Sequence, residues 1–152
     1  MIAVVQRVSR AEVRVEGESV GKIDLGLAVL LGVERGDGDG DADVLARKLC
    51  AMRIFPGRTP MDLSIKDAHG ACLVISQFTL AGSTRKGNRP SFDRAEDPGL
   101  AQKLYERVAE RIRTEGIEVA TGRFAADMKV ELVNDGPVTF ILQARRGSLT
   151  GE

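Results

Sequence analysis

LGLAVLLGV, residues 25–33, is short and apolar throughout, which predicts a β-strand that is covered on both faces. On its N-terminal side, residues 2–8 are rich in valine and form a second expected strand. Residues 12–16 alternate valine with charge, the two-residue period of a half-buried strand, and residues 19–24 continue toward the apolar run. The first part of the chain is therefore expected to be a group of neighbouring strands.

A first helix is expected after the turn of alternating glycine and aspartate at residues 36–41. Asp41 or Asp43 should be its N-cap, because an aspartate side chain accepts hydrogen bonds from the free N–H groups of a first helical turn. The sequence FPG at residues 55–57 should end it. Its buried face is predicted to consist of Leu45, Leu49 and Met52.

The second helix has the clearest boundaries in the sequence. Asp97 is expected as its N-cap and Pro98 as its first residue, where a missing N–H breaks no helical hydrogen bond. Gly116 should end it. Its buried face is predicted to consist of Leu100, Leu104, Val108 and Ile112.

The rest of the chain is expected to add strands and no further helix. Their ranges are 62–66 as a short edge strand, 71–80 as a central strand, 117–120, 129–133 and 138–144, followed by a flexible tail at 145–152. Two helices cannot cover every face of so many strands, so sheet must pack on sheet, within the chain or across a dimer. The predicted fold is one α/β domain, residues 1–152, with mixed, mostly antiparallel β-sheets, two main helices packed on one side, sheet-on-sheet layers and a homodimeric assembly.

Composition narrows the possible functions. The 152 residues include 22 Lys or Arg and 22 Asp or Glu, which disfavours a strongly basic polyanion-binding surface and leaves only a local patch for nucleic acid. A hydrophobic fraction of 43% supplies a core without disulfides or a metal. Cys50 and Cys72 lack zinc-site spacing and are expected to be buried, reduced thiols. Without a signal sequence or an apolar run of membrane length, a cytoplasmic protein with no metal or cofactor is expected.

The sequence contains no conventional hydrolase machinery. The only histidine, His69, precedes Gly70 in an expected turn and should lie at the surface. No GxSxG elbow, phosphate-binding P-loop or HExxH motif occurs. Catalysis would therefore have to use groups other than a strong side-chain base.

Two short motifs remain as candidates for chemistry. SQFTL, residues 76–80, ends the expected central strand with hydroxyl, amide and aromatic groups, and NDGPVT, residues 134–139, places Gly-Pro between two expected strands. Taken locally, the first is an ordinary strand end, and the second is a hairpin turn or a segment with a cis Gly-Pro bond. With MIAVVQRV at the start and TRKGNRPSF at residues 84–92, they resemble the D-aminoacyl-tRNA deacylase family over essentially the whole chain.

The resemblance implies a hydrolase that releases free amino acid and tRNA from D-aminoacyl-tRNA, and from glycyl-tRNA mischarged on tRNA-Ala. A cis Gly136–Pro137 dipeptide of one subunit would enter the active site of the other and reject L-aminoacyl groups with its rigid backbone. A thousandfold discrimination requires about 4 kcal/mol, which a hard steric clash supplies. D side chains would point toward solvent, and glycine has no side chain that could clash.

The catalytic residues that the resemblance implies are Ser76, Gln77, Phe78 and Thr79. Backbone N–H groups near Phe78 and Thr79 would stabilise the carbonyl oxygen of the ester, while the 2′-hydroxyl of the terminal ribose helps to activate water. In an alternative mechanism for the family, Thr79 is the nucleophile, but the sequence shows no group that would activate it.

Two further residues are implied to bind or shape the substrate pocket. Arg7 would hold the Gly136–Pro137 segment by hydrogen bonds; without the resemblance it is a half-exposed strand arginine paired with a surface carboxylate. Met128 would line the pocket, although a methionine before a strand is more often core filler.

The loop of residues 84–90 carries three positive charges, Arg85, Lys86 and Arg89. Such a run is ordinarily a solvated face, but next to a tRNA ester pocket it would bind phosphates near the acceptor end, with Arg145 and Arg146 as possible additions. A patch of this size predicts modest, salt-sensitive binding without sequence readout.

Two other functions stay open at this point. A non-enzymatic RNA-binding module would use the basic loop, although only 4% of the residues are aromatic and RNA readers usually stack bases on aromatic rings. A threonine- or serine-dependent esterase for small molecules would use the SQFTL hydroxyl groups. The partners expected for the favoured function are D-aminoacyl-tRNA and a second copy of the chain, with no membrane and no DNA.

Overall fold

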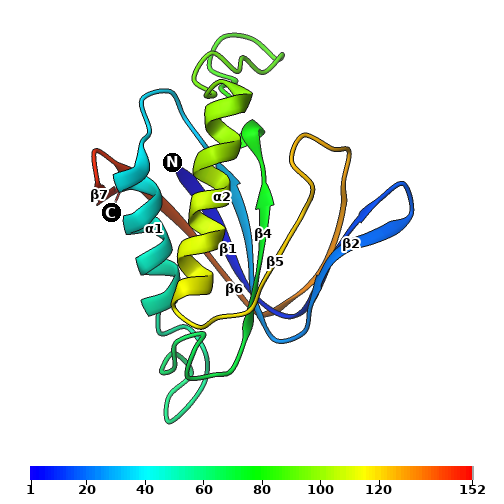
Figure 1. Ribbon diagram of the computed structural model, residues 1–152, viewed down its shortest axis with the longest axis vertical. Coiled ribbons are helices and arrows are strands. Elements are labelled where there is room, and N and C mark those ends of the chain that lie inside the picture. Colours follow the sequence, from blue (N-terminus) through cyan, green and yellow to red (C-terminus); the bar gives the residue numbers. More distant parts are fainter. Residues whose placement is uncertain (152) are drawn as a thin grey trace.

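The strands of the chain form one mixed sheet, and two α-helices pack on one of its faces (Figure 1). The computed structural model describes residues 1–151, and within them seven strands are ordered β5-β4-β3-β1-β6-β7, with β2 paired to β1. The helices are α1 (Asp39–Ala51) and α2 (Pro98–Thr114), with a 3-10 helix η1 (Phe78–Ala81). The strands are β1 (Ile2–Val15), β2 (Glu18–Ile23), β3 (Gly26–Gly32), β4 (Ala71–Ser76), β5 (Val119–Thr121), β6 (Lys129–Arg145) and β7 (Ser148–Thr150).

The helices share one face because of the way they connect parallel strands. α1 lies between β3 and β4 and α2 between β4 and β5, and both of these strand pairs are parallel. Right-handed crossovers in the same sheet place both helices on the same side. The remaining pairs among the described strands are antiparallel. The predicted mixed sheet with two helices on one side is therefore confirmed, and β3 is buried along nearly its whole length as expected.

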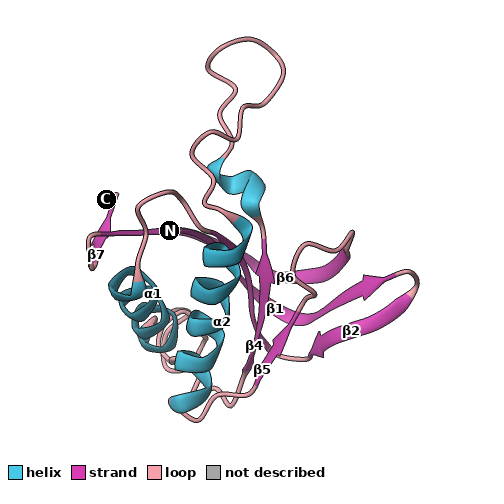
Figure 2. Ribbon diagram, turned by 45° about the horizontal axis from the view of Figure 1, so that its top comes forward, coloured by secondary structure: helices cyan, strands magenta, loops and turns pink. Residues whose placement is uncertain are grey.

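Two hydrophobic clusters occupy the two faces of the sheet. The larger lies between sheet and helices and includes Leu45 of α1 and Val108 of α2. In the smaller cluster, Val13 and Ile23 of the β1–β2 arm join Leu73 of β4. Figure 2 shows this arm on the side of the sheet away from the helices. The β1–β2 arm thus packs against another part of the same sheet within one chain.

The start of α1 differs from the sequence prediction. Its N-cap is Gly38, and Asp41 stands three residues inside the helix, where its carboxylate accepts the Gly38 N–H at 2.9 Å. The other carboxylate oxygen of Asp41 accepts the Gly147 N–H at 2.9 Å. Asp41 therefore caps the helix from within and also ties it to the C-terminal end of the chain, so the prediction of Asp41 or Asp43 as N-cap was wrong.

The start of α2 agrees with the prediction. The Asp97 carboxylate accepts the Gly99 N–H at 3.0 Å, and Pro98 is the first helical residue. Leu104, Val108 and Ile112 are buried as predicted, whereas Leu100, in the first turn, is 42% exposed. Among residues 1–151, no helix combines the length and the apolar composition that crossing a bilayer would need.

Two segments of the predicted strand pattern have a different structure. Residues 62–66 do not form an edge strand. Leu63 makes only an isolated bridge to Phe55, and turns follow it. The Asp62 carboxylate accepts hydrogen bonds from the Arg58 backbone N–H and the Arg53 side chain, which hold this segment as a closed loop. The expected flexible tail at 145–152 instead includes β7, which pairs with the end of β6 across the two-residue turn Arg146-Gly147, while residue 152 lies outside the described residues. Both turn residues have positive φ, 55° and 72°, as tight hairpin turns require.

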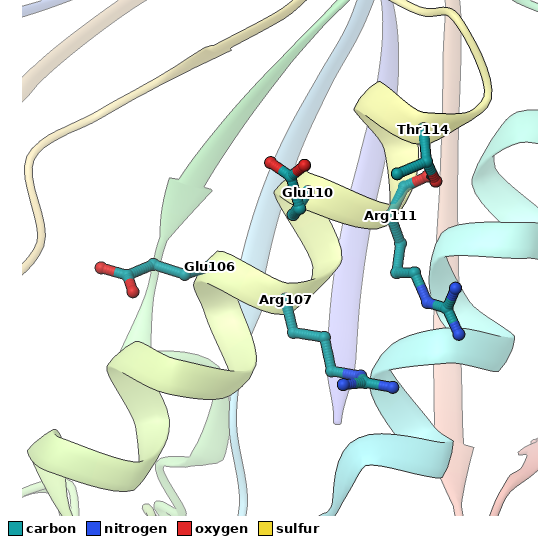
Figure 3. A pocket seen from close by; sticks show the side chains of 5 residues that line it. All are labelled: Glu106, Arg107, Glu110, Arg111 and Thr114. Atoms are coloured by element: carbon teal, nitrogen blue, oxygen red, sulfur yellow. The ribbon is translucent and has the colours of Figure 1, made fainter.

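α1 and α2 are joined by an ion-pair cluster on the outer side of the molecule. A shallow hollow of about 550 Å³ is lined there by Glu106, Arg107, Glu110, Arg111 and Thr114 of α2. Figure 3 shows Arg107 and Arg111 reaching toward α1, and Glu106 and Glu110 pointing elsewhere. Each arginine donates two hydrogen bonds to the Asp43 carboxylate, at 2.8 and 2.9 Å from Arg107 and at 2.9 and 3.0 Å from Arg111. Because the guanidinium groups already have a carboxylate partner, the hollow is a structural contact between the helices.

The ion pair predicts a pH-dependent stability. Hydrogen bonds from Arg107 and then from Arg111 hold the pKa of Asp43 well below its ordinary value. The carboxylate therefore stabilises the fold fully above about pH 4, and this contribution is lost as the pH falls toward the native-state pKa. Asp43→Asn should lower the melting temperature at pH 7 by on the order of a few degrees. The difference in melting temperature between the wild type and this variant should become smaller below about pH 4. Thermal denaturation at pH 7, 5 and 3 measures this difference, with Glu110→Gln as an exposed control. The same difference at all three pH values would contradict the role of the Asp43 ion pair.

Candidate active site

A cavity of about 780 Å³ opens at the carboxyl ends of the parallel strands β3 and β4. Ser76, Gln77 and Phe78 form one wall, and Met128 lies on another. The loop that leads into α2 and the helix's first turn complete the lining, with Asp97 at the rim. This edge of a sheet with parallel strands is a common place for ligands, because connecting loops meet there.

The SQFTL motif leaves the sheet earlier than predicted. β4 ends at Ser76, which is opposite Leu31, and the ladder closes with a hydrogen bond from Gln77 N–H to the Leu31 carbonyl at 2.8 Å. Since β3 ends at Gly32, the next residues of β4 have no partner strand, and the chain turns into η1. The prediction of one central strand through residue 80 was therefore wrong.

The turn into η1 leaves the backbone N–H groups of Phe78 and Thr79 at a helix start. The first N–H groups of a helix have no acceptor within that helix. Among the described residues, neither N–H donates to a backbone carbonyl outside η1. These groups adjoin the cavity wall formed by Gln77 and Phe78, so they are suited to stabilise a developing negative charge on oxygen.

Thr79 has surroundings that do not favour a nucleophile. Its side chain is exposed and does not line the cavity, although Phe78 before it does. Its hydroxyl oxygen accepts a hydrogen bond from the Gln77 side-chain amide, which is a donor and cannot act as a base. The structure thus places Ser76, Gln77 and Phe78 at the cavity and Thr79 just outside it.

Met128 lines the cavity beside a glycine that makes room for it. A Cβ on Gly122 would stand 2.7 Å from the Met128 sulfur, so the methionine lies directly over that backbone. Gly122 is held in place by a hydrogen bond from its N–H to the Val74 carbonyl at 3.1 Å. Met128 therefore lies at the same cavity as Ser76 and Gln77.

The NDGPVT motif is a bulge within a continuous strand rather than a hairpin turn. Gln6 pairs with Thr139 and Val8 with Asn134, so residues 135–138 of β6 stand opposite Arg7 alone. Asn134 spans the bulge: its side-chain oxygen accepts the Val138 N–H and its amide donates to the Thr139 hydroxyl, both at 3.0 Å. The Gly136–Pro137 peptide bond is cis, and both residues are exposed. A widened bulge of this kind holds a short segment out from the sheet.

Arg7 anchors the base of this bulge. Its side chain is buried, with Nε donating to the Asp135 carbonyl at 3.0 Å and a terminal nitrogen donating to the Ile54 carbonyl at 2.7 Å. The Asp135 carboxylate lies 3.9 Å away and is half exposed. Arg7 is therefore a buried bridge between the bulge and the loop after α1, and its surface-pair interpretation does not hold.

The two motifs lie far apart within one chain. Arg7 pairs with Leu27, and Leu27 with Cys72, four residues before Ser76 along β4. Three strand spacings also separate β6 from β4. These offsets correspond to a separation on the order of 20 Å. Gly136, Pro137 and Arg7 accordingly do not line the cavity that contains Ser76 and Gln77.

The basic residues of the 84–90 loop lie beyond the cavity. The loop between η1 and α2 projects from the top of the molecule (Figure 2). Arg85, Lys86 and Arg89 are exposed at its tip and are not part of the cavity lining. Arg145 is also exposed, but it lies 3.9 Å from the Glu34 carboxylate.

The remaining reactive side chains are poorly placed for catalysis. His69 is exposed in a turn and does not line the cavity, as expected. Burial raises the pKa of the half-buried Cys50 thiol to about 11, and burial raises the pKa of the fully buried Cys72 still further, so both thiols stay protonated at neutral pH. Within residues 1–151, no group of three His, Cys, Asp or Glu side chains is arranged to hold a metal ion.

A family model described as D-Tyr-tRNA(Tyr) deacylase matches residues 4–143. The chain belongs to the D-Tyr-tRNA(Tyr) deacylase family. A relative named D-aminoacyl-tRNA deacylase from Anaeromyxobacter dehalogenans is 57% identical over 147 residues, which cover 96% of this chain and 99% of the relative. The family resemblance seen in the sequence motifs is therefore confirmed, and the relative's name describes a hydrolase of aminoacyl-tRNA.

Solved structures with the same fold extend the comparison. One described as "c-Myc DNA Unwinding Element Binding Protein" is 36% identical, with a TM-score of 0.88 over 95% of this chain and 99% of its own. A second, described as a "probable eukaryotic D-amino acid tRNA deacylase", has a TM-score of 0.79 at 16% identity, covering 92% of this chain and 97% of its own, and shows a shared fold.

The sequence analysis of this deacylase-family chain missed the aromatic lining of the cavity. The whole chain has five Phe and one Tyr, and four of these line the cavity: Phe78, Phe92, Tyr105 and Phe124. Tyr105 donates its hydroxyl to the Val74 carbonyl at 2.8 Å, and burial raises its pKa to about 12, so it is a wall residue rather than a base. Phe78 was part of the SQFTL motif and Phe92 of the PSF sequence beside the basic loop, but no local signal pointed to Tyr105 or Phe124.

Proposed function

We propose that the chain hydrolyses the ester bond of D-aminoacyl-tRNA and releases free D-amino acid and tRNA. Family membership supports the substrate class, since the matched family model and the relative's name both describe deacylases of this type. The observation that carries the proposal is the cavity at residues 76–78, lined by the SQFTL motif, together with a separate exposed Gly136–Pro137 segment. The active unit is taken to be the whole chain as one domain, working in the cytoplasm.

Selection against L-aminoacyl groups is assigned to the backbone of Gly136 and Pro137. The segment is exposed, projects from β6 as a bulge and is fixed at its base by Arg7 and Asn134. A backbone held in this way cannot move aside as a side chain would. An L side chain would meet this wall, whereas a D side chain would point outward, so many D-amino acids should be accepted.

A homodimer is proposed because one chain cannot bring both motifs to one substrate. The Gly136–Pro137 segment is on the order of 20 Å from the SQFTL residues of its own chain, so it can reach a cavity only in a second copy. In the proposed assembly the Gly136–Pro137 segment of each protomer enters the cavity of its partner.

The proposed chemistry uses RNA and backbone groups in place of a side-chain base. Water attacks the carbonyl carbon of the ester while the tRNA 2′-hydroxyl assists its activation. The bond from that carbon to the ribose oxygen breaks, and the departing ribose oxygen takes up the proton that the water loses. The backbone N–H groups of Phe78 and Thr79 stabilise the oxyanion, a contribution typically worth several kcal/mol. Gln77 and Ser76 shape the same wall.

Thr79→Ala should retain much of the activity. Because the Thr79 hydroxyl accepts from Gln77 and lies outside the cavity lining, we expect kcat for D-tyrosyl-tRNA to fall by less than about tenfold. Removing a true covalent nucleophile would cost several further orders of magnitude. Single-turnover hydrolysis by the purified variant measures this, and a loss beyond about ten-thousandfold would favour the nucleophilic role.

Glycyl-tRNA mischarged on tRNA-Ala is proposed as a second substrate. Glycine lacks a side chain that could clash with the Gly136–Pro137 backbone, so steric rejection would not exclude it.

The basic tip formed by Arg85, Lys86 and Arg89 is proposed to contact phosphates near the acceptor end, because it projects as an exposed loop adjoining the cavity.

One experiment separates this function from its alternatives. The protein is incubated with D-tyrosyl-tRNA, L-tyrosyl-tRNA and a simple D-tyrosine ester, and release of tyrosine is followed. Rapid cleavage of the D-tRNA ester alone is the expected result. Hydrolysis of the simple ester would favour a small-molecule esterase, and binding of tRNA without turnover would favour an RNA-binding module.

A further inference from the structure

Two aromatic rings form an exposed pair at the mouth of the cavity. The ring centroids of Phe78 and Phe92 are 5.0 Å apart with planes tilted by 58°. Phe78 is 60% exposed and Phe92 is 38% exposed, and both line the cavity. The pair comes from separate segments, since Phe78 begins η1 and Phe92 lies on the loop that leads to α2.

The loop holds Phe92 in place at a narrow neck. Ser83 and Ser91 exchange two backbone hydrogen bonds at 2.8 and 2.9 Å, which close the loop directly before Phe92. A Cβ on Gly82 would lie 3.0 Å from the Phe92 ring, so this glycine allows the ring to pack against the backbone. The ring is thus fixed by its surroundings although its outer part faces solvent.

Positive charges lie just beyond this neck on the same loop. Arg85, Lys86 and Arg89 are exposed at the tip. Aromatic rings beside a cationic segment are the combination with which proteins bind single-stranded nucleic acid, because bases stack on the rings while cations contact the backbone. An aromatic pair whose rings are partly exposed provides such a stacking surface.

We propose that Phe78 and Phe92 form a stacking platform for the unpaired nucleotides that precede the aminoacylated nucleoside of the tRNA. This rests on the proposed function, which puts the ester in the cavity, so the rest of the single-stranded 3′ end must leave through its mouth. Phe92 acts as a positioning residue: it contacts the RNA upstream of the reacting bond and has no part in bond breaking.

The test compares Phe92→Leu, which removes the ring, with Phe92→Tyr, which keeps it. Each variant and the wild type hydrolyse D-tyrosyl-tRNA and the D-tyrosyl ester of adenosine, which has the same ester and terminal nucleoside but no preceding nucleotides. Phe92→Leu should raise KM for the tRNA about 5- to 20-fold and change kcat by less than about twofold. KM for the adenosine ester should rise by a clearly smaller factor than KM for the tRNA, and Phe92→Tyr should restore the wild-type KM for the tRNA.

A second measurement does not depend on catalysis. Fluorescence anisotropy with a labelled ACCA tetranucleotide should show about 5- to 20-fold weaker binding by Phe92→Leu than by Phe92→Tyr. Equal KM increases for both esters, or equal tetranucleotide binding by both variants, would overturn the platform. If the wild type cleaves no D-tyrosyl-tRNA, the proposed function fails and the tetranucleotide comparison alone decides whether the platform exists.

Discussion

Gly136→Ala should reduce the ratio of kcat/KM for D-tyrosyl-tRNA to that for L-tyrosyl-tRNA by about a hundredfold. Gly136 has a φ of 137°, a conformation that L side chains rarely adopt, and an added Cβ would lie 2.9 Å from the Val138 backbone nitrogen and 2.6 Å from its side chain. The segment must shift to accept the methyl group. Since the proposed wall discriminates by position alone, a displacement of about 1 Å is enough to open space for the L side chain.

Gly17→Ala is the matched control for this change. Gly17 also has a positive φ, 81°, but an added Cβ would meet no atom within 4 Å. The control therefore introduces comparable backbone strain in the turn between β1 and β2, away from the bulge. It should leave the D-to-L ratio unchanged. A Gly136→Ala protein that folds normally and keeps the wild-type ratio would refute the role of this backbone.

Arg7→Ala should affect both stability and discrimination. Arg7 is 8% exposed and donates to the carbonyls of Asp135 and Ile54, so its removal leaves one buried and one partly buried acceptor without a partner. Charged hydrogen bonds contribute about 1.5–3 kcal/mol each, which predicts a loss of about 3 kcal/mol. For a chain of this size, that lowers the melting temperature by about 6–12 °C. The bulge also loses an anchor, so the D-to-L ratio should fall by about tenfold or more.

Arg10→Ala separates this effect from the mere loss of a charge on β1. Arg10 is half exposed and pairs with Glu131 across the strands at 2.7 Å. An exposed ion pair contributes little to folding, so the melting temperature should stay within about 2 °C of the wild type. Arg7→Lys is a second comparison, since lysine keeps the charge but cannot direct two fixed donors to two carbonyls. Equal melting temperatures for Arg7→Ala and Arg10→Ala would contradict the anchoring role.

Sequence reasoning predicted those elements whose signals are local. β3 was recognisable because an apolar run without alternation is typical of a strand buried on both faces, and α2 because Asp97 and Pro98 mark a helix start. The tail was misread because the positive-φ turn Arg146-Gly147 contains only one glycine as a signal. The end of β4 was missed because it depends on where the neighbouring β3 stops, at Gly32.

The candidate site was only partly predictable for a similar reason. The SQFTL and NDGPVT motifs identified Ser76 to Phe78 and the Gly-Pro segment, but their separation within one chain follows from strand order and register. The cluster of aromatic residues also arises only in three dimensions, since Phe92, Tyr105 and Phe124 follow unrelated local patterns. The low aromatic content argued against RNA contact, yet the fold concentrates most of those residues in one cavity.

The bulge at residues 135–138 has a consequence for how this chain can change in evolution. Regular ladder pairing continues on either side of it, at Thr139 and at Asn134. An insertion or deletion inside would slip the following part of β6 by one position and turn its core-facing side chains, such as Ala144, toward water. Homologues should therefore tolerate length changes at the 84–90 tip, where nothing is paired, but keep the spacing from Asn134 to Thr139 constant.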